Sequence, residues 1–297
     1  SKEVLDGFSK RDDRVRLVHQ ENKGLTPSLN RGIDMARGKF VARMDADDIS
    51  HPRRFEHQVQ YLEATPSVGI VFSWATEIDE GGQKIGRWSA PVSPEAISWS
   101  LLFTNRLCHP SAMMRHSFVE TVGGYAEWAI HAEDYELWTR AILQTQLAVI
   151  PRTLVKYRRQ NGSITATKRK QQLQTCGAVA EKLHRTLFGE ASNDKIVRFL
   201  AWMGHDDFES AVSKMDDVDL WKTQKYIRKI YELFKYNFQV SGQGLRVRRD
   251  AMSKIFFLVE KSRKSSTKKN LEKGRTYAMK PRREAIAWLV AKIKGAG

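Results

Sequence analysis

The chain has 297 residues, and 41% of them are hydrophobic, which is enough for one large globular domain or two smaller ones and excludes a disordered protein. It has no uncharged apolar stretch of about 18 residues, and residues 1–10 lack the apolar centre of a signal peptide, so we expect a cytosolic protein without a transmembrane helix. Its two cysteines, Cys108 and Cys176, lie far apart without CxxC spacing and support neither a disulfide framework nor a zinc site.

The basic charge of the chain is concentrated near its end. The formal net charge is +16, and residues 248–297 contain 15 Lys and Arg against 4 Asp and Glu, so +11 of the excess lies there. Such a segment attracts polyanions, and charge alone does not distinguish membrane phospholipid from nucleic acid.

The first part of the chain alternates helical and strand patterns. Apolar spacing predicts helices over residues 1–8, 26–36 and 53–64, and strands over residues 15–18, 40–44 and 68–74. Gly81 and Gly82 predict a hairpin between residues 76–78 and 84–88. This alternation is typical of an α/β protein with a parallel, doubly wound sheet.

Helical patterns dominate the rest of the chain. Before residue 167 we expect helices over 93–103, 118–124 and 133–145, an extended segment over 109–115, and edge strands over 147–150 and 155–159. Beyond it we expect helices over 176–188, 196–203, 220–238 and 255–260, and a final amphipathic helix around 286–293. These patterns divide the chain into residues 1–166, a helical region 167–260, and a basic linker with an amphipathic helix, 261–297.

Three carboxylates, Asp45, Asp47 and Asp48, follow directly after the predicted strand at 40–44. Ligands of open α/β sheets bind beyond the carboxyl ends of strands. Because such closely spaced carboxylates repel one another, a cation would compensate their charge, and hard oxygen ligands favour magnesium, manganese or calcium. An acidic surface turn ahead of a helix that is capped at Ser50 fits the same residues.

Six pieces of sequence, one of which contains the three carboxylates, carry a resemblance to a known family. They occur in this order: Asn-Lys-Gly-Leu at 22–25 with Leu-Asn-Arg-Gly-Ile at 29–33, Ala-Arg-Met-Asp-Ala-Asp-Asp-Ile-Ser at 42–50, His-Pro-Ser-Ala-Met at 109–113, Val-Gly-Gly-Tyr at 122–125, Ala-Glu-Asp-Tyr-Glu-Leu-Trp at 132–138, and Tyr-Arg-Arg-Gln-Asn-Gly-Ser at 157–163. Together they resemble the family 2 glycosyltransferases, inverting enzymes with the type-A nucleotide-diphospho-sugar transferase fold. The resemblance implies a mostly parallel open sheet flanked by helices, followed by an α-helical C-terminal region.

On the donor side, the resemblance assigns metal and nucleotide contacts. It implies that Asp47 is the main ligand of a Mn2+ or Mg2+ ion, and that Asp45 assists the metal or reaches the donor. Asp48 is expected to be an acid at a helix N-terminus. Asn30 lies in a stretch that the family uses near the donor, although Leu29 stands where many members carry Arg.

On the acceptor side, the resemblance assigns the catalytic base. Asp134 matches the family's base, which takes the proton of the acceptor hydroxyl. Glu133 would shape the acceptor side, where the family also places His109. A helix-capping role fits both acids as well, and a structural role fits the histidine. Gln160 stands where relatives often have His, so no metal role is transferred to it.

The beginning of the chain departs from the family pattern. Members begin with a strand, a helix and a second strand that read the nucleotide base, a unit of about 30 residues or more. This chain starts after that unit. We expect a type-A fold that is incomplete at its N-terminus, from either a fragment or a degenerate member, with weak or absent transfer by residues 1–297 and activity in the full gene product.

The sequence therefore predicts a sugar transfer from a nucleotide-diphospho-sugar to a glycan or polyprenyl-linked acceptor, in the assembly of cell-surface polysaccharide. The basic C-terminal helices would hold the cytoplasmic enzyme on the anionic inner face of the plasma membrane, or they would simply cover the sheet. Two alternatives stay open: a catalytically inactive interaction protein of the same fold, and a basic nucleic-acid-binding protein, although no specific nucleic-acid motif occurs.

Overall fold

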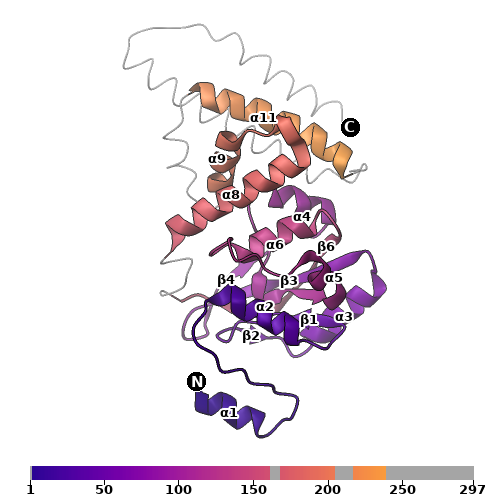
Figure 1. Ribbon diagram of the computed structural model, residues 1–297, viewed down its shortest axis with the longest axis vertical. Coiled ribbons are helices and arrows are strands. Elements are labelled where there is room, and N and C mark those ends of the chain that lie inside the picture. The colour runs from indigo at the N-terminus through magenta and orange to yellow at the C-terminus, as the bar shows by residue number, and fades with distance from the viewer. Residues whose placement is uncertain (1, 161–167, 205–216, 239–297) are drawn as a thin grey trace. The chain divides into compact units, whose positions relative to one another are not determined.

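The computed structural model describes residues 2–160, 168–204 and 217–238 (Figure 1). The chain divides into two compact units, residues 1–206 and 207–297. The predicted helices at 255–260 and 286–293, the basic linker, and the domain boundary predicted between residues 166 and 167 lie outside the described residues. No helix in the described ranges is long and apolar enough to cross a membrane.

The first unit is built on a mixed sheet. Its strands are β1 (Phe40–Ala42), β2 (Ile49–Ser50), β3 (Val68–Ile78), β4 (Lys84–Trp88), β5 (Met113–Arg115) and β6 (Gln146–Arg158). They lie in the order β1-β5-β3-β6-β2, and β4 pairs with β3. Among the described strands, β3 and β6 are parallel, and the other four pairs are antiparallel. The α/β class is thus confirmed, but the sheet is mixed and not mostly parallel, because β5 runs back between β1 and β3.

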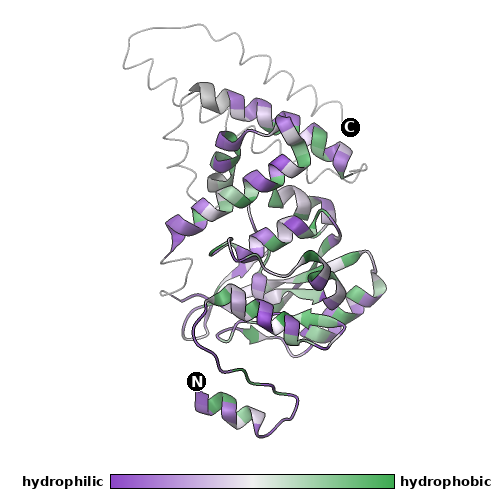
Figure 2. Cartoon of the chain, in the orientation of Figure 1, coloured by the Kyte–Doolittle hydropathy of each residue, from purple (hydrophilic) through white to green (hydrophobic). Residues whose placement is uncertain are grey.

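Helices surround the sheet and continue beyond it. The helical elements are α1 (Lys2–Ser9), α2 (Leu25–Met35), α3 (Arg54–Ala64), α4 (Pro94–Leu101), the 3-10 helix η1 (His109–Ser111), α5 (His116–Val122), α6 (Glu133–Ala141), α8 (Arg169–Phe188), η2 (Gly189–Ala191), α9 (Asp194–Gly204) and α11 (Asp217–Asn237). Hydrophilic and hydrophobic residues alternate along α8 and α9 (Figure 2), as expected for helices with one buried face. The predicted helical C-terminal region is confirmed for the described residues.

Local signals account for several of these boundaries. Ser93 caps α4, because its Oγ accepts a hydrogen bond from the backbone N–H of Ala96 at 3.4 Å, and Pro94 occupies the first turn. Helix α5 ends at Gly123, which adopts a left-handed conformation with φ of 82°. The hairpin predicted at Gly81 and Gly82 joins β3 to β4, as expected.

Two strand predictions were wrong. Residues 15–18 form a partly exposed loop, because their alternating pattern has no neighbouring strand to pair with. The two predicted edge strands are one long strand, β6, which lies between β3 and β2. Its register against β3 shifts where Ser73 faces Ile150 and Trp74 faces Thr153, which leaves residues 151–152 as a bulge. A bulge accommodates Pro151, which cannot donate a ladder hydrogen bond.

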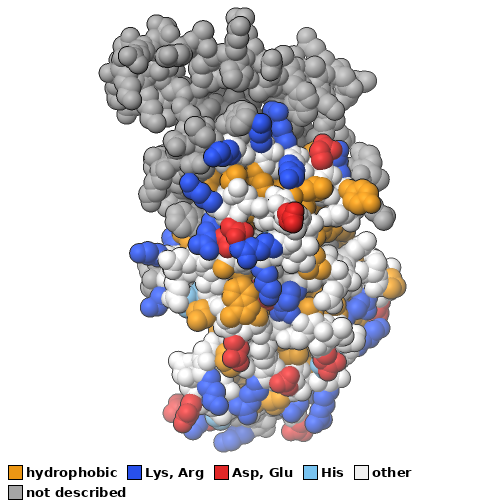
Figure 3. Space-filling model, turned by 45° about the horizontal axis from the view of Figure 1, so that its top comes forward, with side chains coloured by type: hydrophobic (Ala, Val, Ile, Leu, Met, Phe, Trp, Pro, Cys, Tyr) orange, Lys and Arg blue, Asp and Glu red, His pale blue; other side chains and the backbone are white. Residues whose placement is uncertain are grey.

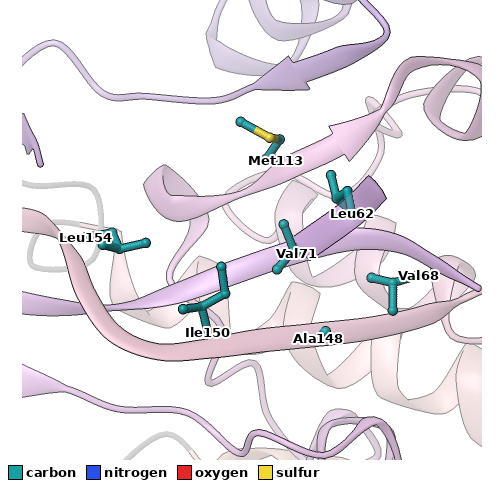
Figure 4. Packing of buried hydrophobic residues seen from close by; sticks show 7 residues of the cluster. All are labelled: Leu62, Val68, Val71, Met113, Ala148, Ile150 and Leu154. Atoms are coloured by element: carbon teal, nitrogen blue, oxygen red, sulfur yellow. The ribbon is translucent and has the colours of Figure 1, made fainter. Parts of the chain in front are cut away.

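A hydrophobic cluster joins α3 to the sheet (Figure 4). Its buried members come from α3, β3, β5 and β6: Leu62, Val68, Val71, Met113, Ala148, Ile150 and Leu154. Burying each of the larger side chains contributes about 1.5–3 kcal/mol. This packing fixes the ends of β1 and β6, which carry the candidate site.

Candidate functional site

The three predicted acids lie in a turn directly after β1, which we call the acidic loop, residues 45–48. The end of β6 holds this loop. Arg158 donates from its backbone N–H to Asp48 Oδ1 at 2.8 Å and from Nε to the carbonyl of Asp47 at 2.9 Å. The guanidinium also donates to the carbonyls of Asp79 and Glu80 in the β3–β4 hairpin. Strand β6 therefore determines where the acids lie.

Each acid of the loop has a different environment. Asp45 Oδ2 is 2.5 Å from Arg43 Nη1, and a third of its side chain is exposed. Asp47 is exposed, and its Oδ2 accepts from Gln160 Nε2 at 2.9 Å. Among the described residues, Asp48 Oδ2 is buried with no hydrogen-bond partner, and burial, aided by the charges of the other two acids, raises the pKa of Asp48 to about 6.

Asp48 was expected to begin a helix, and that prediction was wrong. Helix α3 begins at Arg54, and Asp48 instead precedes the short strand β2. Its carboxylate accepts the backbone N–H of Arg158 in β6, the strand that pairs with β2. Asp48 therefore fastens the acidic loop to β6 and leaves Asp45 and Asp47 as the acids nearest to solvent.

The second pair of predicted acids begins α6. Asp134 is partly buried, its Oδ1 accepts from the backbone N–H of Tyr135 at 2.7 Å, and its Oδ2 accepts from Asn105 Nδ2 at 2.7 Å. Burial and, second, the charge of Glu133 raise the pKa of Asp134 to about 7. Glu133 is itself buried, and burial raises its pKa as well.

His109 is buried against Tyr125 and against Trp138 of α6. Its Nε2 lies 2.8 Å from the hydroxyl of Tyr125, and its ring packs against Trp138 with 5.8 Å between centroids. Burial, and then the charge of Arg43, lower the pKa of His109 well below its usual value, so the imidazole is neutral near pH 7.

Asn30 fastens α2 to the turn after α5. Its Nδ2 donates to the carbonyl of Tyr125 and its Oδ1 accepts the N–H of the same residue, each at 2.8 Å. Gly124 has φ of 62°, and a Cβ there would lie 2.7 Å from Asn30 Oδ1, so glycine is required. Both ends of the Asn30 amide therefore take part in hydrogen bonds to Tyr125. A contact of Asn30 with the donor stays a prediction.

Arg43, for which we predicted no role from the sequence, connects the two groups of acids. Its side chain is 7% exposed, and its Nε is buried with no hydrogen-bond partner in the part of the chain that the structure describes. Its positive charge acts on the pKa of residues from both groups: Asp48, His109, Tyr125, Glu133 and Asp134. One guanidinium thus faces the acidic loop and the start of α6. A cation inside the apolar run at 40–44 was the signal that could have identified it.

The acidic loop offers oxygen ligands for a divalent cation. Magnesium and related hard cations are commonly bound by one or two carboxylates together with substrate phosphates and water. Asp45 and Asp47 fit this requirement, since both carboxylates lie near solvent. Within the described residues there is no group of three or more His, Cys, Asp and Glu side chains that could hold a metal by itself.

Comparison with known proteins identifies relatives for this arrangement. Residues 1–123 match the family model described as Glycosyl transferase family 2. An uncharacterized glycosyltransferase of Haemophilus influenzae is 29% identical over 248 residues, which cover 77% of this chain and 71% of that protein. The amylovoran biosynthesis glycosyltransferase AmsE of Erwinia amylovora is 35% identical over 153 residues, which cover 51% of this chain and 56% of that protein.

Most of these alignments are partial. The chain spans about half the length of most of the curated relatives that it matches first. Among solved structures, a mannosyltransferase from Pyrobaculum calidifontis in complex with GDP-Man and Mn2+ aligns with a TM-score of 0.44 at 15% identity, over 84% of this chain and 74% of that one. A likeness at that level carries no inference about ligands.

Proposed function

The chain belongs to glycosyltransferase family 2, and we propose that it transfers a sugar from a nucleotide-diphospho-sugar to a glycan or lipid-linked acceptor, with inversion at the anomeric carbon. One observation carries the proposal. The acidic loop and the start of α6, about 90 residues apart in sequence, face the same buried Arg43 guanidinium. Such an arrangement supports a donor half and an acceptor half of one site.

Asp134 is the proposed general base. A base works best when its pKa is close to the working pH, and the pKa of Asp134 is raised to about 7. Its carboxylate would accept the proton of the acceptor hydroxyl as that oxygen attacks the anomeric carbon. Glu133 and the neutral His109 would shape the acceptor side, because both are buried, Glu133 precedes Asp134, and His109 contacts Tyr125, whose pKa Asp134 affects.

Asp47 and Asp45 are the proposed ligands of a Mn2+ or Mg2+ ion. When bound, the cation supplies electrostatic stabilisation of the charge that develops on the departing nucleoside diphosphate. The protein's part is to hold the two carboxylates in place. Gln160 does this for Asp47 and Arg43 for Asp45, through the hydrogen bond and the ion pair described above.

The acceptor and the setting are proposed from the relatives and the charge. The Erwinia relative is named for the biosynthesis of amylovoran, which supports a role in cell-surface polysaccharide assembly. Residues 248–297 lie outside the described residues, and their net charge of +11 supports peripheral binding to the anionic inner face of the plasma membrane. On the face drawn in Figure 3, the described Lys and Arg side chains are interspersed with hydrophobic ones.

Calorimetric binding of UDP and GDP tests the donor half. The titrations are run with and without MnCl2 on the chain, on Asp47→Ala, and on Asp34→Ala as a matched control, because Asp34 is an exposed acid of α2 outside the site. We expect manganese-dependent binding of one nucleotide that Asp47→Ala abolishes and Asp34→Ala retains. Binding that Asp47→Ala leaves intact would contradict the proposed metal ligand.

A further inference from the structure

Asn105 is held by the loop that precedes η1. Its Oδ1 accepts the backbone N–H of Leu107 at 3.0 Å. An asparagine amide has one acceptor end and one donor end, so this bond leaves the NH2 group for other partners. That group donates to Asp134 Oδ2 at 2.7 Å, across 29 residues of sequence. The orientation of the amide is therefore set by the backbone, independently of Asp134.

Both carboxylate oxygens of Asp134 thus receive one donor from the protein. The N–H of Tyr135, at the start of α6, binds Oδ1, and Asn105 binds Oδ2. Two fixed donors on different oxygens determine the plane of the carboxylate. Each oxygen keeps a further lone pair, which an incoming hydroxyl can use.

We propose that Asn105 is a positioning residue that fixes the carboxylate of Asp134 and favours its ionised form, so that it can accept a proton from a hydroxyl-bearing acceptor. This inference rests on the proposed function of Asp134 as the base. Neither the motif that contains Asp134 nor the one that begins at His109 includes Asn105.

Several other groups also affect the pKa of Asp134, and some of them oppose the effect of Asn105. The titratable and charged groups that face it are Glu133 on α6, Arg43 after β1, Tyr125 after α5 and Cys176 on α8. Burial and the charge of Glu133 favour the neutral acid, whereas Arg43, the Tyr135 N–H and Asn105 favour the carboxylate. A hydrogen bond donated to the charged form of an acid lowers its pKa, so loss of this donor should raise it.

The sharpest variant is Asn105→Asp. It has nearly the same shape and retains an oxygen for the N–H of Leu107, but it replaces the donor facing Asp134 with a second carboxylate. Asn22→Asp is the matched control, since Asn22 Oδ1 accepts the N–H of Gly24 at 3.0 Å in the same two-residue turn, in an exposed loop. Asn105→Ala removes the donor without adding charge and provides a second variant.

The first readout is the titration of Asp134 itself, followed by 13C NMR of the carboxyl carbon in aspartate-labelled protein. Asp134→Asn identifies the signal, and the double variant with Asn105→Asp identifies the new acid. We expect Asn105→Asp to raise the upper apparent pKa of the pair by about one unit or more, Asn105→Ala to raise it by less, and Asn22→Asp to leave it unchanged. An unchanged titration in both Asn105 variants would overturn the inference.

The second readout is release of nucleoside diphosphate from UDP-glucose or GDP-mannose with MnCl2 between pH 6 and 9, with water as the hydroxyl-bearing acceptor of the sugar. We expect Asn105→Asp to shift the rising limb of kcat to higher pH by the same amount as the NMR titration, while KM for the donor stays unchanged. A pH profile like that of Asn22→Asp would overturn the inference. If Asp134→Asn retains full turnover, the proposed function of Asp134 fails instead, and the carboxyl titration still decides whether Asn105 controls its ionisation.

Discussion

In the acidic loop, Asp45 and Asp47 lie near solvent, whereas at the start of α6 the protein partly encloses Asp134, and burial raises the pKa of both acids there. Asp47 is exposed and a third of the Asp45 side chain is accessible, but Glu133 is 8% exposed and Asp134 has a donor on each oxygen. A carboxylate that binds a cation and a diphosphate must be accessible from solvent, and the bound cation can compensate its charge. A general base needs a pKa close to neutral, which burial supplies.

The two halves are joined by a second buried guanidinium. Arg54, at the start of α3, is 1% exposed and donates from Nη2 to the carbonyls of Arg43 at 2.8 Å and Ala112 at 3.2 Å. Its Nε donates to the side chain of Gln58 at 2.8 Å. Since Arg43 leads into the acidic loop and Ala112 follows His109, Arg54 ties the exposed half to the enclosed one.

The largest expected effect concerns the enclosure of Asp134. Its pKa of about 7 in the folded protein is above the value of about 3.9 for an unfolded chain, so between these pH values the folded state binds more protons and stability falls as pH rises. Because of Asp134, we expect the free energy of unfolding of wild type to fall by about 3–4 kcal/mol from pH 4 to pH 8. Asp134→Asn should not show this decrease. Urea unfolding of both proteins at each pH measures this difference.

Only the difference between the two proteins isolates Asp134. His109 and His184 have lowered pKa values, which give the opposite slope, because their unfolded states bind protons that the folded state does not. Both proteins share that contribution, so it cancels. A difference between wild type and Asp134→Asn that stays constant from pH 4 to pH 8 would contradict the enclosure of this carboxylate.

The second largest effect is expected when Arg54, which connects the two halves, is replaced. Arg54→Met keeps most of the aliphatic volume but leaves two buried carbonyls without this donor, and we expect a loss of about 3 kcal/mol in the free energy of unfolding. Arg53→Met is the matched control, since Arg53 is exposed and pairs with Glu56, and it should change stability by less than about 0.5 kcal/mol. Equal urea midpoints for the two variants would mean that Arg54 does not join the halves.

The exposed half was easier to predict from sequence than the enclosed one. The acidic loop follows an apolar run, and both features are local, so Asp45 and Asp47 were placed correctly after β1. The partners of the acids are not local. Asn105 lies 29 residues from Asp134, and Arg158 lies 110 residues from Asp48, and no periodicity reports such a contact.

The direction of the strands could not be predicted from the sequence pattern either. Parallel and antiparallel strands share the same two-residue alternation, so periodicity does not distinguish them. The alternation of helices and strands suggested a parallel sheet, but β5, which follows α4 and η1 in the chain, returns antiparallel to both β1 and β3. This return brings residues 109–112 close to the acidic loop, since Arg43 donates its backbone N–H to the carbonyl of Ala112 at 3.0 Å.

The smallest expected effect compares single polar groups from the two halves. Tyr125→Phe removes the hydroxyl that lies 2.8 Å from His109 Nε2, and because the imidazole is buried, its nitrogen loses this partner without gaining water. We expect a loss of about 1–2 kcal/mol in the free energy of unfolding. Asp47→Asn alters an exposed carboxylate and should change stability by less than about 0.5 kcal/mol. Urea unfolding of the two variants would refute the contrast if Asp47→Asn proved the more destabilising, because the acidic loop would then contribute more to folding than its exposure implies.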